Sequence, residues 1–234
     1  NVPTTRGNKI ALAFMRNHMG QRDRPEITLF ITTQQQESTF TIETLIQGLD
    51  GFVRGESQIF SRTDRARNGD FTSILLQDFF VNFGEENFDI SVQDSESETE
   101  QQKGFIITAE DPSHELTVYA LSSRIVSADS FMAISCQNYP FARNYQYYIF
   151  STSNEAIETL TASQFLLTPC EKSTRIMVRT SQVHSHPFWV EPSVDVTDPA
   201  SVTQFETIYA RLFNPFDTLM LTNFEDLTGT IITS

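Results

Sequence analysis

Histidine, cysteine and carboxylate side chains are the residues of this sequence that could do chemistry, but their spacing matches no motif for metal binding. His184 and His186 are separated by one residue, so an extended strand would place both imidazoles on the same face. Two histidines do not make a zinc site, and no further Cys or His lies at metal-ligand spacing. We interpret the pair as the end of a strand before Pro187, and we expect no metal and no cofactor.

The sequence also contains no recognisable motif of an enzyme. Because it has 30 Asp and Glu residues, carboxylate pairs occur by chance, and the separation that a glycosidase needs is spatial. No Gly-x-Ser-x-Gly turn, His-Glu-x-x-His helix or glycine-rich phosphate loop is present. Neither Cys136 nor Cys170 lies in the motif of a catalytic thiol. We therefore expect a protein that is not an enzyme, with a hydrolase of spatially assembled carboxylates as the remaining catalytic alternative.

One aromatic segment is the best candidate for a recognition surface. Tyr139, Phe141 and Arg143 occur together in a segment that also contains a proline. Tyrosine and arginine are enriched at the energetic centres of protein interfaces. Tyr148 and Phe150, further along the chain, are interpreted as strand residues that face a core. Tyr139, Phe141 and Arg143 are therefore the predicted binding residues for a protein or a glycan.

The charge balance excludes some classes of partner. The 234 residues carry a net charge of −14, from 16 Lys and Arg against 30 Asp and Glu. A nucleic-acid-binding protein needs a basic surface to neutralise phosphates, and an anionic membrane surface also attracts basic segments. No apolar run approaches the roughly 20 residues that a membrane-spanning helix requires. We expect no nucleic acid and no membrane span, and we interpret the acidity as a contribution to solubility.

Alternation of apolar and polar residues predicts an all-β fold. The segments 26–32 and 39–43 both alternate and are separated by the polar residues 34–38, a pattern typical of a β-hairpin. Further strands are predicted at residues 10–15, 57–61, 73–79, 88–92, 104–108, 116–121, 130–135, 145–152, 164–168, 175–180, 218–222 and 230–233. The polar segments 62–68 and 93–103 are predicted loops. Residues 200–213 have apolar side chains at helical spacing, which predicts one short helix.

The same series of segments occurs twice in the chain. The matching pairs, in order, are Lys9–Asn17 with Tyr145–Asn154, Phe30–Glu43 with Phe165–Arg179, Ser73–Phe79 with Thr218–Phe224, and Gly104–Thr108 with Gly229–Thr233. Four matches in the same order predict two tandem β-sandwich-like units, 1–125 and 126–234, with a β-propeller-like fragment as the alternative.

The second copy is expected to be incomplete at its C-terminus. In the first copy the strand at 104–108 is followed by another strand, Leu116–Leu121, whereas the second copy reaches Ser234 before the corresponding strand. The missing strand would be absent or supplied by another chain or segment. An uncovered sheet edge invites pairing with another strand. A structural assembly unit that polymerises through strand exchange at this edge is therefore an alternative function.

Several of these strand motifs together resemble the N-terminal domain of IgGFc-binding protein. The motifs are Lys103–Thr108, Glu115–Tyr119, Ser127–Phe131 leading to Tyr147–Tyr148, Ser163–Thr168 with Thr174–Arg179, and Asp226–Ser234. The resemblance covers nearly the whole chain. It implies a secreted, extracellular, non-enzymatic module for binding or adhesion, within a larger mucus, adhesive or defence protein of innate immunity. Antibody Fc binding is not carried over, because binding surfaces depend on loops rather than on core strands.

The two cysteines, Cys136 and Cys170, could form a disulfide or remain two buried thiols, and their number alone does not decide between these states. The extracellular environment implied by the resemblance favours the disulfide. Such a bridge would close a loop of about 35 residues and would contribute on the order of 3–4 kcal/mol in the chain-entropy model.

Overall fold

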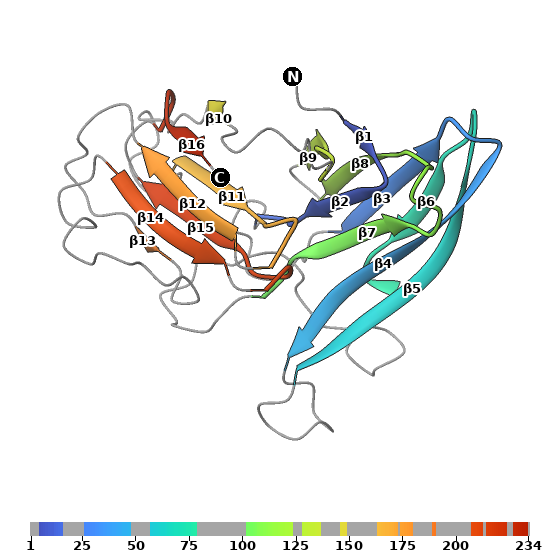
Figure 1. Cartoon of the computed structure of the whole chain (residues 1–234), viewed down its shortest axis with the longest axis horizontal. Helices are drawn as coiled ribbons and strands as arrows, with labels where there is room; N and C mark the ends of the chain where they lie inside the picture. Colours follow the sequence, from blue (N-terminus) through green and yellow to red (C-terminus); the bar gives the residue numbers. More distant parts are fainter. Residues whose placement is uncertain are drawn as a thin grey trace. The chain divides into compact units, whose positions relative to one another are not determined.

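The computed structural model describes the residue ranges 5–15, 26–47, 57–78, 102–123, 128–136, 146–148, 163–172, 174–179, 189–190, 207–212, 214–223 and 227–233. Every element named within these ranges is a β-strand (Figure 1), so the all-β prediction is confirmed. The chain divides into two compact units. Unit 1 comprises Asn1–Asp94 and Gln102–Gln137, and unit 2 comprises Ser95–Gln101 and Asn138–Ser234.

Unit 1 is a sandwich of two antiparallel sheets. Sheet A contains, in spatial order, β1 (Arg6–Gly7), β8 (Leu116–Ser123), β3 (Glu26–Thr33) and β6 (Thr72–Leu75), with β9 (Ala128–Met132) also paired to β8. Sheet B contains β2 (Lys9–Leu12), β7 (Phe105–Ala109), β4 (Glu37–Gln47) and β5 (Ser57–Arg67), in that order.

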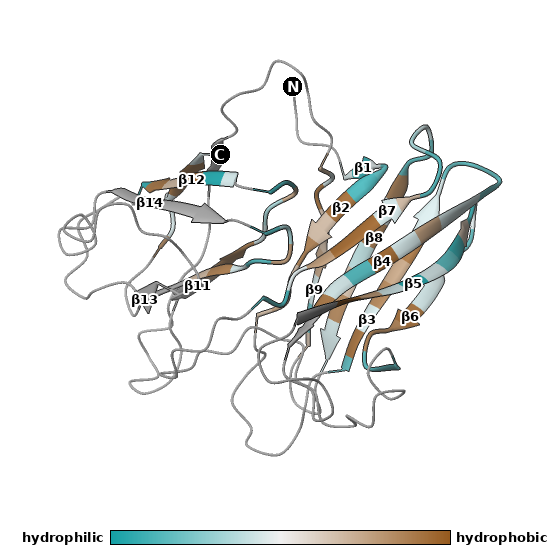
Figure 2. Ribbon diagram, turned by 60° about the horizontal axis from the view of Figure 1, so that its bottom comes forward, coloured by the Kyte–Doolittle hydropathy of each residue, from teal (hydrophilic) through white to brown (hydrophobic). Residues whose placement is uncertain are grey.

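The core of unit 1 lies between these sheets. In β3, Ile27, Leu29 and Ile31 are fully buried while the residues between them are not, as alternation requires. The register of sheet B places Ile10 opposite Ile107, and Ile107 opposite Ile42, and all three are at 0% exposure. Hydrophobic and hydrophilic bands alternate along β3 and β4 (Figure 2). The inward residues of both sheets form one hydrophobic cluster, which is the arrangement of a β-sandwich.

The predicted hairpin at residues 26–43 is wrong. β3 and β4 follow one another in the chain, but β3 pairs with β6 and β8 in sheet A, whereas β4 pairs with β5 and β7 in sheet B. The polar residues 34–36 therefore carry the chain from one sheet to the other across the end of the core. Each of the two strands buries one apolar face in the core. Two strands that face each other from opposite sheets need the same alternation of apolar and polar residues as two strands paired in a hairpin, so the sequence pattern does not distinguish the two arrangements.

Unit 2 repeats this design. Its sheet C contains β10 (Gln146–Tyr148), β16 (Ile231–Thr233), β12 (Thr174–Arg179) and β14 (Thr207–Leu212), in that order, and its sheet D contains β11 (Ser163–Leu167), β15 (Leu219–Asn223) and β13 (Trp189–Val190). Sheets B and C have the same strand order. In sheet B, β7 lies between β2 and β4, and β5 pairs with β4; in sheet C, β16 lies between β10 and β12, and β14 pairs with β12. The predicted pair of related sandwich-like units is confirmed.

One detail of the predicted repeat is corrected by the register. Phe30 is half-buried, whereas Phe165 is buried, so these two residues do not occupy equivalent positions. The Leu76 amide donates to the Ile27 carbonyl at 2.9 Å, and Leu221 pairs with Phe165. The repeat that matches Ser73–Phe79 with Thr218–Phe224 makes Leu76 equivalent to Leu221. Because the strand partner of Leu76 is Ile27 and that of Leu221 is Phe165, Phe165 occupies the position of Ile27 and not that of Phe30. A shift by an odd number of residues exchanges the two faces of a strand, which explains the different burial.

The boundary between the units lies later than residue 125. β9 pairs with β8 over five residues. Beyond it, Ser135 bridges to Ile10, and the Cys136 amide donates to the Lys9 carbonyl at 2.8 Å. Residues 128–136 therefore belong to unit 1, because backbone hydrogen bonds attach them to both of its sheets.

The predicted helix at 200–213 is wrong over residues 207–212, which form β14. All six of these residues pair with β12, from Thr207 opposite Arg179 to Leu212 opposite Thr174. A short apolar run can match both the helical period of 3.6 residues and the strand period of two. Here Ile208, Ala210 and Leu212 also alternate, so the pairing with β12 decides the conformation. The rest of that segment, the predicted strand 88–92 and most of the predicted loop 93–103 lie outside the described residues.

Candidate functional site

The sequence-predicted binding residues and cysteines have different outcomes. Tyr139, Phe141 and Arg143 lie outside the described residues, so their role stays a prediction. Cys136 and Cys170 form the predicted disulfide. The structure adds two surfaces of unit 1 that the sequence did not single out as sites, one apolar and one polar.

The apolar surface, called here the aromatic face, consists of Phe71, Tyr119 and Met132 on the outer side of sheet A. Their exposed fractions are 54%, 41% and 42%. The rings of Phe71 and Tyr119 meet edge to face, with centroids 5.9 Å apart and planes at 74°. Met132 of β9 lies directly opposite Tyr119 of β8. Three large apolar side chains thus share one exposed area.

The register of sheet A explains why these side chains gather. Val118 and Ala120 point into the core, so the intervening Tyr119 must point outward. The residues opposite one another across the sheet then run from Ser73 through Phe30 and Tyr119 to Met132. This row crosses β6, β3, β8 and β9 and contains no charged side chain.

Exposed aromatic side chains on a rigid sheet are suited to recognition. Protein interfaces are enriched in aromatic residues and methionine at their centres, and contiguous exposed apolar areas mark sites of interaction. The alternation of β8 was sufficient to place Tyr119 outward. Its neighbours could not be found in the same way, because Phe71 and Met132 are distant in sequence and only the strand pairing brings them to Tyr119.

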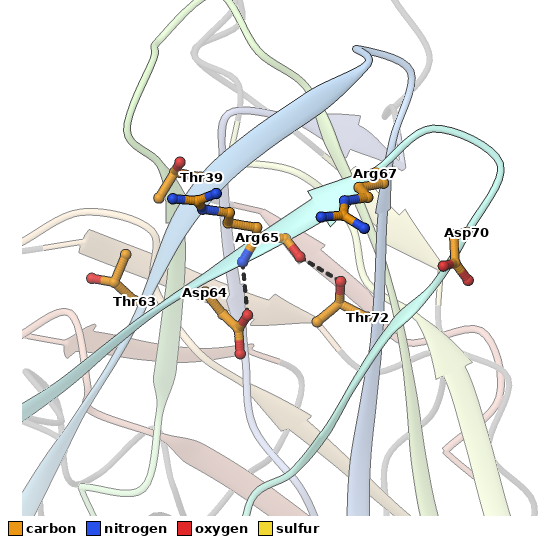
Figure 3. Close-up of a pocket in the computed structure, with 7 residues that line it drawn as sticks. All are labelled: Thr39, Thr63, Asp64, Arg65, Arg67, Asp70 and Thr72. Carbon is orange, nitrogen blue, oxygen red and sulfur yellow. Dashed lines mark hydrogen bonds between the residues drawn. The ribbon is translucent and has the colours of Figure 1, made fainter.

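The polar surface is a hollow of about 560 Å³ on β4, β5, the turn that follows β5 and the start of β6 (Figure 3). It is lined by Thr39, Thr63, Asp64, Arg65, Arg67, Asp70 and Thr72. The predicted loop at 62–68 is wrong, because residues up to Arg67 belong to β5 and pair with β4 in a continuous register. Charged side chains are tolerated there because, among the described strands, β5 lies at the edge of its sheet.

Basic and acidic side chains in and beside the polar hollow are equal in number, with Arg62, Arg65 and Arg67 against Glu37, Asp64 and Asp70. The guanidinium groups of Arg65 and Arg67 each lie 3.3 Å from the carboxylate of Glu37. The carboxylate of Asp64 lies 3.2 Å from the Arg62 guanidinium and accepts a hydrogen bond from the Arg65 amide at 2.8 Å. A site for an anion would need uncompensated positive charge. This hollow instead offers threonine hydroxyls beside charges that sum to zero, which suits a neutral polar ligand.

Three connecting segments meet at one end of unit 1 and hold that end together. The Asn68 side-chain amide donates to the Gln34 carbonyl at 2.8 Å. The Thr33 hydroxyl donates to the Glu115 carbonyl, also at 2.8 Å. The Nδ1 atom of His114 lies 3.2 Å from the Ser38 hydroxyl. Side-chain hydrogen bonds therefore link the turn after β3, the turn after β5 and the loop between β7 and β8.

Asp111 organises the loop between β7 and β8. Its carboxylate accepts hydrogen bonds from the Ser113 hydroxyl at 2.6 Å and from the Ser113 amide at 2.9 Å. Nε2 of His114 lies 3.6 Å from the same carboxylate. The two bonds from Ser113, and to a smaller extent the nearby His114, lower the pKa of Asp111, because they favour the charged carboxylate.

Comparisons with known proteins found no matching family model, no matching curated protein and no matching solved structure. Within the described ranges, no three His, Cys, Asp or Glu side chains are grouped so that they could hold a metal ion. The same ranges contain no helix with the length and apolar character needed to cross a membrane.

Proposed function

We propose that this chain is an extracellular, non-enzymatic module that binds a protein partner through the aromatic face of unit 1. The observation that carries the proposal is the joint exposure of Phe71, Tyr119 and Met132 on a sheet whose other side forms the core. A sandwich holds such side chains in fixed positions, so little conformational entropy is lost when a partner covers them. The disulfide supports the extracellular location, since disulfides persist in oxidising compartments.

The resemblance to the N-terminal domain of IgGFc-binding protein supports the same function. Most of the residues that carry it lie on strands that build the two sandwiches, among them β7, β8, β11, β12 and β16. The resemblance therefore concerns the architecture, and we propose membership of that family on the sequence motifs. Secretion and adhesion follow from the proposed membership, while the partner must be argued from the surface itself.

Charge favours a basic partner. The chain carries −14, while the row of residues across the aromatic face is uncharged. A partner with an apolar centre and a net positive charge would be steered toward the chain at long range and would then cover the face without burying an unpaired charge. Its association rate should fall as salt is raised, because salt screens the long-range attraction.

The proposal is tested with variants of the aromatic face. Proteins captured from the native secretion by the immobilised chain are identified, purified and measured singly by surface plasmon resonance. Tyr119→Thr and Phe71→Ser remove the aromatic rings from exposed positions, and we expect each to raise Kd by roughly 30-fold if it is a hot spot. Ile59→Thr is the matched control, because Ile59 is 56% exposed but lies on sheet B. Equal losses in all three variants, or none in the first two, would refute the proposal.

Glycan binding is the second candidate function, and the polar hollow favours it. Thr39 and Thr63 line the hollow beside charges that sum to zero, so a neutral saccharide could exchange hydrogen bonds with their hydroxyls. Thr39→Val and Thr63→Val remove hydroxyls at nearly constant shape. A glycan-array signal that both substitutions abolish, and that Tyr119→Thr leaves unchanged, would support this function. An array without signal at any concentration would exclude it.

A further inference from the structure

The edge of strand β11 in unit 2 differs from the corresponding strand of unit 1. In unit 1, β3 lies inside sheet A, with β6 on one side and β8 on the other. Its counterpart β11, which also precedes the crossing to the second sheet, pairs with β15 on one side. Among the strands that the structure describes, none pairs with the other side of β11. The position beside β3 is thus occupied by β8 in unit 1. No described strand occupies the corresponding position beside β11 in unit 2.

The strand that fills this position in unit 1 has a clear pattern. β8 pairs with β3 in the antiparallel direction along the whole of both strands, from Leu116 opposite Thr33 to Ser123 opposite Glu26. Its residues Leu116, Val118 and Ala120 are buried in the core. The position therefore requires a segment that can extend over several residues and that presents an apolar side chain at every second position.

We propose that the side of β11 with which no described strand pairs accepts an antiparallel strand from a partner polypeptide, with apolar residues alternating as in β8. β11 offers the backbone amides and carbonyls of Ser163–Leu167 that do not pair with β15, and main-chain hydrogen bonds are the source of affinity when a strand is added to a sheet. The donor is specified by the duplicated topology, because β8 shows which pattern and direction fit the place beside β3. The inference does not depend on the aromatic face, which belongs to unit 1.

The probe is a fluorescein-labelled peptide with the β8 sequence, LTVYALSS, extended by lysines for solubility, and its binding to the full chain is followed by fluorescence anisotropy. Two further peptides carry N-methyl groups on alternate residues, one on the first, third, fifth and seventh and the other on the remaining four. An added strand uses only one of its two edges, so we expect one methylated peptide to bind like the parent and the other about tenfold more weakly or less. Equal affinities of the two methylated peptides would overturn the proposal, as would no binding of the parent.

The location of the bound peptide gives a second, independent result. Leu116 of β8 lies beside the C-terminal end of β3, so a photo-crosslinker at the N-terminus of the peptide should label the chain near Leu167. Labelling near the start of β11 would contradict the antiparallel direction. Labelling of β3 would show that the peptide displaces β8 in unit 1, and this result would also overturn the inference.

A substitution in β11 tests the acceptor without changing the peptide. Leu166→Lys places a charge on the half-buried outer position of this strand, and lysine is a residue that protects sheet edges from further pairing. Met177→Lys is the matched control, because Met177 is also half-buried but lies in β12, between two neighbours. We expect weaker peptide binding only for Leu166→Lys, and equal binding of the two variants would contradict the proposal. If the chain without peptide forms dimers and the peptide dissociates them, the strand donor is a second copy of this chain and not a separate partner.

Discussion

Replacement of Ile42 by alanine tests the sandwich assignment of unit 1 most directly. Ile42 lies in β4, has 0% exposure, and sits between Arg62 of β5 and Ile107 of β7. Truncation of a fully buried isoleucine typically costs about 2–5 kcal/mol, because the transfer free energy is lost and a cavity remains. Unit 1 has about 130 residues, so its unfolding entropy is about 270 cal/mol/K, and a loss of about 3 kcal/mol lowers Tm by about 11 °C.

The neighbouring residue provides the control for this prediction. Thr41 points away from the core, and its hydroxyl lies 3.4 Å from that of Thr63 on the exposed side of sheet B. Thr41→Val keeps the branched shape and should change the free energy of unfolding by about 0.5 kcal/mol or less. Both variants are measured by urea unfolding monitored by circular dichroism and by differential scanning calorimetry. A cost of less than about 1 kcal/mol for Ile42→Ala, or equal costs for the two variants, would refute the face assignment of β4.

Three further predictions concern the turns and the disulfide. Gly69 has a φ of +77°, so Gly69→Ala should cost about 1–2 kcal/mol in urea unfolding although nothing would contact the new Cβ; an unchanged midpoint would contradict this. The pKa of Asp111 is lowered, so its contribution to stability is present above its ordinary pKa and is lost as the pH falls through the folded-state value. Asp111→Asn should therefore lower stability at pH 7, and unfolding curves at pH 2 should show a smaller difference, whereas a constant difference would contradict the assignment. Cys136→Ser with Cys170→Ser should cost about 3–4 kcal/mol. Dithiothreitol should cause a similar loss in the parent chain and none in the variant; a variant as stable as the parent would exclude a stabilising bridge.

The candidate sites were less accessible to sequence reasoning than the strands. Tyr119 could be placed on an outer face from the alternation of its own strand. Phe71 and Met132 could not be assigned to the same surface, because they lie on other segments and reach Tyr119 only through pairing and packing. The polar hollow was hidden for a similar reason. The cluster around Arg65 has the composition of a loop, but pairing with β4 holds it in strand β5.

The amino-acid sequence by itself determined that the chain forms strands, where most of them lie, and that their series occurs twice. The physical reason is that the period of two in β3, β4 and β8 is a local property, which any buried sheet face imposes on its residues. The tertiary structure decided which strands share a sheet. β3 and β4 alternate in the same way whether they pair with each other or face each other across the core, and only the pairing of β3 with β8 and of β4 with β7 distinguishes the two. That same choice of partners leaves one side of β11 without a neighbour among the described strands.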